Sequence, residues 1–308
     1  MKPLPTHTPY DGSSKPFTIG LKPLELKDWI EIDEMLEAYL AEKARLYATI
    51  PERVFVEEAD TRDAQREVLD LLSAHLAAEL PRICPGERQR SLIATGLQRI
   101  AAADASEPPL RTASMLVQED LILMRKGKNG WRLAAGSLCF PSSWSLTEKF
   151  GHPLQDIHTP VPGFGRGTRN ADLITRMFDN LQGQGVMRWN WSLQANADLY
   201  HPLSNDQRNE RTQKRPSKFA GDEIFASAFI RVERQTLRKL PKSGDILFTI
   251  RIYLDPLAVL ERHPDRITLA ASFAEQLSGL DIAQLDYKGL TADRDRLVER
   301  LGRMARQV

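Results

Sequence analysis

The first third of the chain places its apolar residues at the spacing of helices. In residues 22–50 these positions fall three or four apart, which predicts one long amphipathic helix. A second helix is predicted over residues 61–80, where Pro81 marks the end, and a third over residues 87–105. The apolar positions of the first helix are Trp29, Ile32, Met35, Leu36, Tyr39 and Leu40.

The pattern changes to that of strands at about residue 112. Two β-rich runs in residues 112–140 are joined at "GKNG", and the Asn-Gly pair within it is the strongest short-range signal of a hairpin. Residues 185–194 ("GVMRWNWSLQ") predict another strand. The clearest strand pair is formed by residues 224–238, which alternate β-formers with charged residues, and residues 246–254.

Helices are also predicted between and after these strands. Ser145 is expected to begin a short helix, because Glu148 follows at the spacing of a capping box. Residues 168–182 ("TRNADLITRMFDNLQ") predict a longer helix. The C-terminal residues 257–308 predict helices with charge pairs four residues apart.

Together these elements predict an α+β fold. We expect a central antiparallel sheet of about five strands within residues 112–256, a helical N-terminal layer, and C-terminal helices over residues 257–308. Residues 1–24 are rich in proline and hydroxyl residues and are expected to form a flexible arm. Residues 25–308 are expected to form a single domain.

Composition and charge argue against several classes of protein. The 308 residues include 42 lysines and arginines against 41 acidic residues, so no overall field attracts nucleic acid or an anionic membrane. No apolar run approaches the length of a membrane span, and the N-terminus has no secretory apolar region. A cytoplasmic protein is expected. Cys84 and Cys139 are too few for an iron–sulfur cluster, so any electrons used in catalysis come from a partner.

Most familiar catalytic motifs are missing from the sequence. It has no H-E-x-x-H zinc motif and no G-x-S-x-G nucleophile elbow. "GFGRGTRN", residues 163–170, superficially resembles a phosphate-binding loop but lacks the preceding strand and the Lys-Ser/Thr pair. Arg166 and Arg169 within it either reach an anionic group of a ligand or are solvated.

His158, in "LQDIHTPVPG", is the best-placed histidine. Pro160 and Pro162 fix the backbone that follows it, and a stiff backbone suits a metal ligand whose ring must keep its orientation. The residue pattern alone leaves a ligand, a base and a packed ring as alternatives. His201 is a weaker candidate.

The strand "IRVERQTLRKLP" is unusually charged. Alternation places Arg231, Glu233 and Gln235 on one face of the predicted sheet and Arg234 on the other, with Val232 and Thr236. One face is either solvated or lines a polar pocket, in which a guanidinium stabilises a developing anion.

Five motifs in order resemble the catalytic (alpha) subunit of the haem-dependent oxidative N-demethylases. The resemblance covers roughly residues 16–257 and rests on the motifs "VQEDLILM", "LAAGSLCFPSSW", "EKFGHPLQDIHTPVPG", "RWNW" and "RVERQTLRKLPKSGDILFTIRIYLDPL". It implies a PAS-like sheet that binds haem b through a histidine. It also implies oxidative demethylation of a small secondary amine such as dimethylamine, with O2 and electrons from an NADPH-dependent partner subunit that carries FMN and [2Fe–2S].

Carried over to this sequence, the resemblance makes His158 the axial iron ligand. The strand with Arg231, Glu233 and Arg234 would supply the polar groups on the oxygen side, with Arg234 the first choice. Arg166 and Arg169 are then candidates to contact the cofactor. The alternative function is a haem-binding PAS-type gas or redox sensor without turnover, because fold does not fix function.

Overall fold

The architecture is built around one antiparallel sheet. The computed structural model describes residues 4–84, 86–101, 106–219 and 224–306, and a seven-stranded sheet lies within these ranges. The strand order is β1-β5-β6-β7-β3-β4-β2, and each neighbouring pair is antiparallel. The strands are β1 (Lys22–Leu24), β2 (Phe55–Glu57), β3 (Asp120–Gly127), β4 (Gly130–Ser137), β5 (Gly185–Gln194), β6 (Phe229–Lys239) and β7 (Ile246–Pro256).

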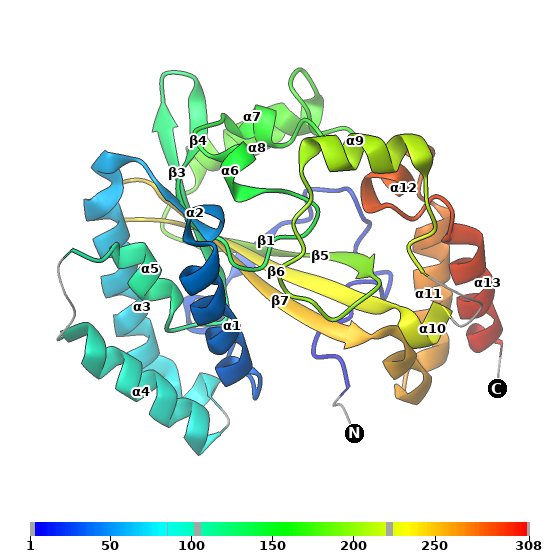
Figure 1. Cartoon of the computed structure of the whole chain (residues 1–308), viewed down its shortest axis with the longest axis horizontal. Helices are drawn as coiled ribbons and strands as arrows, with labels where there is room; N and C mark the ends of the chain where they lie inside the picture. The colour runs from blue at the N-terminus through cyan, green and yellow to red at the C-terminus, as the bar shows by residue number, and fades with distance from the viewer. Residues whose placement is uncertain (1–3, 85, 102–105, 220–223, 307–308) are drawn as a thin grey trace.

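Helices cover both faces of the sheet and gather in three groups (Figure 1). The first group holds η1 (Leu26–Asp28), α1 (Leu36–Thr49), α2 (Pro51–Val54), η2 (Ala59–Thr61), α3 (Arg62–Ile83), α4 (Glu87–Ala101) and α5 (Pro109–Ser114). The second holds α6 (Leu146–Lys149), α7 (Leu154–Ile157) and α8 (Arg169–Asn180). The third holds α9 (Asn205–Lys214), α10 (Ile224–Ser227), η3 (Leu257–Arg262), α11 (Arg266–Ser278), α12 (Ile282–Lys288) and α13 (Arg294–Ala305).

The two faces of the sheet have different coverings. On one face, α3 and α5 pack against β3 and β7, while α11 and α13 pack against β5 and β6. On the other face, α6, α7 and α8 pack their apolar residues against β3 and β7. We call this second face the cavity face, because the candidate site lies between it and those short helices.

The α+β prediction is confirmed, and several elements lie where expected. The hairpin joins β3 to β4, and Gly130 adopts a positive φ of 93°, which a glycine accommodates without steric cost. The strands predicted over residues 185–194 and 246–254 and the helix after Thr168 are present. The sheet has more strands than the five expected, since β1 and β2 are too short for alternation to reveal them.

The long helix predicted over residues 22–50 is wrong in its first half. The observed helix α1 begins at Leu36. Before it, the backbone carbonyls of Asp28 and Trp29 accept hydrogen bonds from the buried Arg234 guanidinium, and the amide of Asp33 donates to the Gln118 side chain at 3.1 Å. A helix would need these groups for its own ladder, so tertiary contacts override the apolar spacing.

Two other predicted boundaries change, and one predicted cap is formed differently. The second helix continues past Pro81 to Ile83, because a proline in the last turn removes only one hydrogen bond. Ser145 does begin a helix, but Glu148 accepts from the amide of Asn205 instead of closing a capping box. Residues 224–227 are helical, and the strand starts at Phe229. Residues 102–105 of the third predicted helix lie outside the described residues.

Residues 4–24, expected to belong to a flexible arm, pack along the edge of the sheet. The Tyr10 side chain is fully buried and stacks on Phe273 of α11, with ring centroids 4.7 Å apart. Lys22–Leu24 then pair with β5 as β1. The buried Tyr10 ring and the β1 pairing therefore anchor the arm, and residues 11–21 pass between these two anchors.

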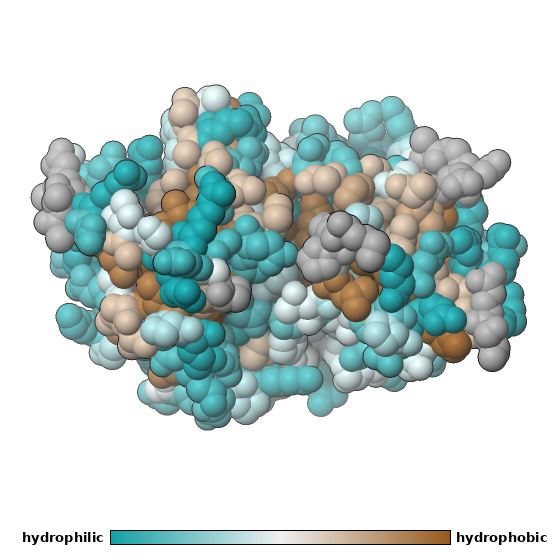
Figure 2. Space-filling view, turned by 90° about the horizontal axis from the view of Figure 1, so that it is seen from below, coloured by the Kyte–Doolittle hydropathy of each residue, from teal (hydrophilic) through white to brown (hydrophobic). Residues whose placement is uncertain are grey.

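The face of the molecule seen in Figure 2 is mixed in character. The face in Figure 2 shows apolar residues in patches among hydrophilic ones. Among the described residues, no helix combines the length and the apolar character that crossing a membrane requires.

Candidate functional site

A cavity of about 270 Å³ lies between the cavity face of the sheet and helices α6 to α8. Most of its lining is apolar or aromatic, which suits a flat hydrophobic ligand. The apolar part includes Ile122, Met124, Leu133, Leu138, Phe140, Leu154, Ile157, Val161, Phe164, Ile174, Met177, Phe178, Leu237, Phe248 and Ile250. These residues come from four strands, from helices α7 and α8 and from the loops beside them, so the cavity forms only when the whole fold is assembled.

His158 lines this cavity from the end of α7. Its backbone amide donates to the carbonyl of Leu154 at 3.1 Å, and its ring lies 6.5 Å from the ring of Phe164, centroid to centroid. Within the described residues the imidazole has no hydrogen-bond partner. Burial, helped by the charge of Arg188, lowers the pKa of His158 to about 4. The ring is therefore neutral at physiological pH and can ligate a metal without first losing a proton.

The sheet supplies a polar floor beneath the apolar walls. Strands β5 and β6 place Asn190 directly opposite Glu233 and Arg188 directly opposite Gln235, and all four side chains line the cavity. The Glu233 carboxylate accepts a hydrogen bond from Gln235 Nε2 at 2.9 Å and lies 3.5 Å from Nε of Arg231. The predicted alternation along this strand is thus confirmed, and Glu233 is the charged residue of the trio that reaches the cavity.

Cationic side chains surround the same cavity. Lys149 donates to the carbonyl of Ile157 at 3.0 Å, one residue before His158. Arg208 of α9 lies at another part of the lining, and its Nε is buried without a partner among the described residues. Lys288 donates to the carbonyl of Trp191 at 2.5 Å, and burial lowers its pKa to about 8. Glu233 is the one acidic residue among the described lining residues, so the cavity carries surplus positive charge.

Arg231 and Arg234 do not line the cavity. Arg231 is fully buried and donates to the carbonyl of Phe140 at 2.5 Å. It therefore contacts Glu233 without reaching the cavity itself. Arg234 points to the opposite face of the sheet, where its Nε lies 2.8 Å from the Glu31 carboxylate. The sheet therefore separates Arg234, our first choice from the sequence, from His158, because neighbours on a strand point to opposite faces.

Arg166 and Arg169 also lie away from the cavity lining. Arg166 is exposed and pairs with Asp156 at 2.8 Å, and Arg169 is exposed at the start of α8. The glycine-rich segment that contains them leads into α8, whose start is capped by the Thr168 hydroxyl. The glycine-rich sequence is therefore accounted for by the turn that leads into α8, and no bound phosphate is needed to explain it.

Sequence reasoning missed several polar residues of the cavity. Arg188 and Asn190 belong to the motif "RWNW", and Lys149 to "EKFGHPLQDIHTPVPG", yet neither motif alone indicates which side chains face inward. His201 also lines the cavity, and burial lowers its pKa. The isolated bridge between Ser142 and His201 brings this second histidine to the site. No local pattern around His201 predicts that long-range contact.

This donor set fits haem better than a metal ion held by protein ligands alone. Within the described residues, no cluster of three or more His, Cys, Asp or Glu residues could hold an ion. The cavity instead combines a neutral, unpartnered imidazole, large apolar walls and cations that can pair with propionates. Fold and site together define an α+β protein with a largely apolar, histidine-lined cavity that fits a haem.

The comparison with known families agrees with that class. Residues 20–298 match the family described as "Haem-dependent oxidative N-demethylase, alpha subunit-like". The chain belongs to this family, which supports a haem-dependent oxidative N-demethylase-like function in general. The alpha-subunit description also suggests a multi-subunit enzyme.

Proposed function

We propose that this chain is the haem-binding subunit of a monooxygenase that removes a methyl group from a small secondary amine of the dimethylamine kind. The observation that carries the proposal is the neutral, unpartnered His158 imidazole in an apolar cavity whose floor bears a carboxylate. Bound haem b would supply the binding and reduction of O2. The protein's part is to hold the cofactor, orient the amine and provide protons.

His158 would hold the haem iron, and the stiff segment through Pro160 keeps its ring oriented. Lys149 and Arg208 are the proposed partners of the cofactor's propionates, since both are cations of the cavity lining. Arg208 is also mostly buried, and its partnerless Nε needs an acceptor. We assign no cofactor contact to the exposed Arg166 and Arg169.

Glu233 is the proposed site for the ammonium group of the amine. Its carboxylate reaches the cavity from the sheet floor, where Gln235 and Arg231 fix its position. Partial desolvation strengthens the attraction between a carboxylate and an ammonium group. Arg231 acts as a positioning residue behind Glu233, and Arg234 has no direct role at the cavity.

The proposed reaction needs two electrons that this chain does not store. Overall, an N–CH3 group, O2, two electrons and two protons give N–H, formaldehyde and water. We propose that the electrons come from NADPH through a separate reductase subunit carrying FMN and [2Fe–2S], and that the complex works in the cytoplasm. The scarcity of cysteines supports an outside source, since the chain has only two, both free and buried.

The test is formaldehyde production by the purified chain with a reductase partner, NADPH and a secondary amine. The proposal expects formaldehyde in proportion to NADPH consumed, and loss of formaldehyde when O2 is removed. A haem-loaded protein that binds O2 but releases no formaldehyde with any small secondary amine would contradict it. That outcome would support the alternative function of a sensor.

A further inference from the structure

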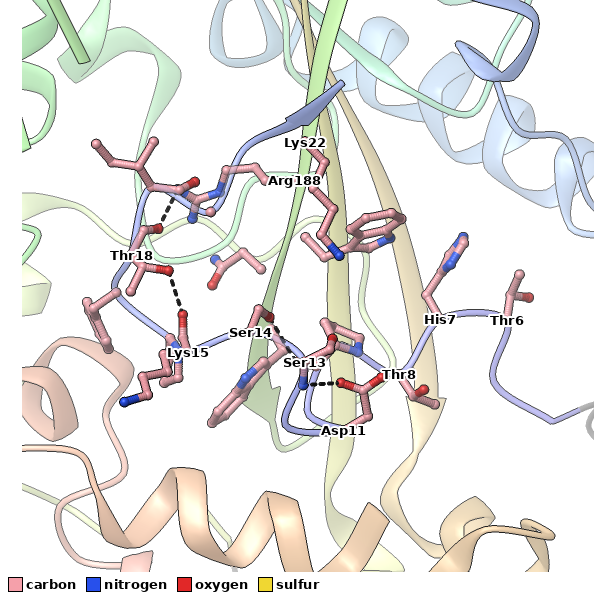
Figure 3. A pocket seen from close by; sticks show the side chains of 18 residues that line it. Thr6, His7, Thr8, Asp11, Ser13, Ser14, Lys15, Thr18, Lys22 and Arg188 are labelled. Carbon is pink, nitrogen blue, oxygen red and sulfur yellow. Dashed lines mark hydrogen bonds between the residues drawn. The ribbon is translucent and has the colours of Figure 1, made fainter. Parts of the chain in front are cut away.

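Arg188 lies where two cavities meet. Besides the cavity that holds His158, a second cavity of about 290 Å³ lies between the N-terminal arm and residues 188–191 of β5 (Figure 3). Phe17, Ile19, Arg188 and Asn190 line both cavities. A group bound by the Arg188 guanidinium is therefore within reach of the floor that carries Glu233.

Only some of the hydrogen-bond donors of the Arg188 guanidinium have partners among the described residues. Its Nη1 donates to the carbonyls of Thr18 and Ile19 at 3.2 and 3.4 Å, as Figure 3 illustrates for Thr18. Its Nε is buried and has no partner among the described residues. The Nε and Nη2 edge is the fork with which arginine clasps a carboxylate through two parallel hydrogen bonds. A buried charged donor without a partner is costly, so this edge is ready for an acceptor.

The charges of the second cavity also favour an anion. Its described lining includes Lys15, Lys22 and Arg188 against a single acidic residue, Asp11. Asp11 already accepts a hydrogen bond from the Ser13 amide at 2.8 Å. A positive cavity that adjoins the haem site raises the local concentration of small anions and repels simple cationic amines.

The two binding groups are diagonal neighbours on one face of the sheet. Arg188 on β5 lies directly opposite Gln235 on β6, and Glu233 is two residues before Gln235 on β6. Side chains in this relation are close enough to contact one small ligand. An ammonium group on Glu233 would therefore leave a carboxylate of the same molecule near Arg188.

We propose that the substrate is a secondary N-methyl amine that also carries a carboxylate, with N-methylglycine as the smallest example. This inference rests on the proposed function. In the reaction, the methyl carbon is oxidised and its bond to nitrogen breaks. O2 is reduced with two electrons from the reductase and two protons, and the products are the primary amino acid, formaldehyde and water. Arg188 binds the carboxylate and sets the specificity.

The test is calorimetric titration of the purified full-length protein with N-methylglycine, dimethylamine and N-methylethanolamine, which replaces the carboxylate with a neutral hydroxyl. We expect N-methylglycine to bind at least about tenfold more tightly than the other two, which corresponds to one good charged contact. Arg188→Met should abolish this preference by weakening the binding of N-methylglycine, while dimethylamine, which has no carboxylate for the fork to hold, should bind no more weakly than to the wild-type protein. Arg188→Lys should restore only part of it, because lysine keeps the charge without the fork.

Arg176→Met is the matched control, since Arg176 is exposed on α8 and should leave the preference intact. Equal affinities for the three amines in the wild-type protein would overturn the inference. So would an Arg188→Met protein that loses haem absorbance without any change in selectivity, because the fork would then serve a haem propionate. A protein that takes up no haem overturns the proposed function itself, so the two failures are distinguishable.

Discussion

Arg234 stabilises the fold from the side of the sheet opposite the cavity. It is almost fully buried, and its contacts with Glu31 and two backbone carbonyls tie the segment before α1 to β6. Arg234→Met should lower the free energy of unfolding by about 3 kcal/mol, because it removes the cation beside the Glu31 carboxylate and leaves two backbone carbonyls without their donor. Urea denaturation measures this effect.

The control for Arg234 is Arg303→Met in the exposed pair between Arg303 and Glu299 of α13. That substitution should change the free energy of unfolding by no more than about 0.5 kcal/mol. If Arg234→Met is as mild as the control, the contacts across this face are not stabilising. If it removes amine binding while haem and stability stay intact, Arg234 belongs to the site after all.

Glu31 makes part of the stability dependent on pH. Burial alone would raise its pKa, but the hydrogen bond from His7 and the charge of Arg234 hold the pKa of Glu31 at about 2, against an ordinary value of 4.5. A depressed carboxyl pKa contributes stability that is present above about pH 4.5 and is lost as the pH falls toward 2. The wild-type protein should therefore lose about 2 kcal/mol more than Glu31→Gln between pH 6 and pH 3. Equal losses in urea titrations at the two pH values would contradict this.

Glu233 should affect the amine much more than the cofactor. Glu233→Gln keeps the size and the hydrogen bonding of the side chain but removes the charge that binds an ammonium group. We expect the KM for the amine to rise about tenfold or more, with the haem content unchanged. Steady-state formaldehyde assays and absorbance spectra of the same samples measure both. An unchanged KM would remove Glu233 from the substrate site.

The sequence allowed some of the cavity residues to be predicted and not others. His158 was identifiable because its local sequence is stiff and the surrounding motifs resemble one family. The strand pattern could separate Glu233 from Arg234 by face, but it could not say which face meets the cavity. Arg188 and His201 depend on strand register and a long-range bridge, which no local pattern contains.

At the scale of elements, the N-terminal arm is the segment whose attachment is simplest to test. Tyr10→Ala removes the buried ring that stacks on Phe273, so the arm should detach locally while the sheet stays folded. Chymotrypsin should then cleave after Phe17 at least about tenfold faster, which corresponds to about 1.4 kcal/mol of easier opening. Leu4→Ala is the control, because Leu4 is 41% exposed. Equal cleavage rates in the two variants would show that Tyr10 does not hold the arm.

Elements with strong local signals were predicted correctly, and those set by tertiary contacts were not. The β3–β4 hairpin and the β6–β7 pair have turn residues and alternation that need no outside information. The segment before α1 has helical spacing, yet its carbonyls serve Arg234 from β6. Periodicity cannot identify α7, which has only four residues, or α9, which has no apolar residue.

At the scale of the whole molecule, the sheet separates a set of buried ion pairs on one face from the cavity on the other. One face buries arginine–carboxylate pairs that hold the N-terminal segment in place, and the other forms the floor of the cavity that His158 lines. Helix α7 brings His158 over that floor, and the arm closes one side through Phe17 and Ile19. The family match over residues 20–298 agrees with this arrangement, while the PAS-like description of the sheet stays a prediction.

The haem-binding role of His158 is tested most directly by the absorbance spectra of the purified wild-type and His158→Ala proteins. We expect about one haem per chain in the wild-type protein, with a Soret band that weakens or shifts strongly in His158→Ala. His201→Ala, which alters the second histidine of the same cavity, should keep the wild-type band. A wild-type protein that cannot take up haem, or a His158→Ala protein with an unchanged Soret band, would contradict the assignment of His158 as the haem ligand.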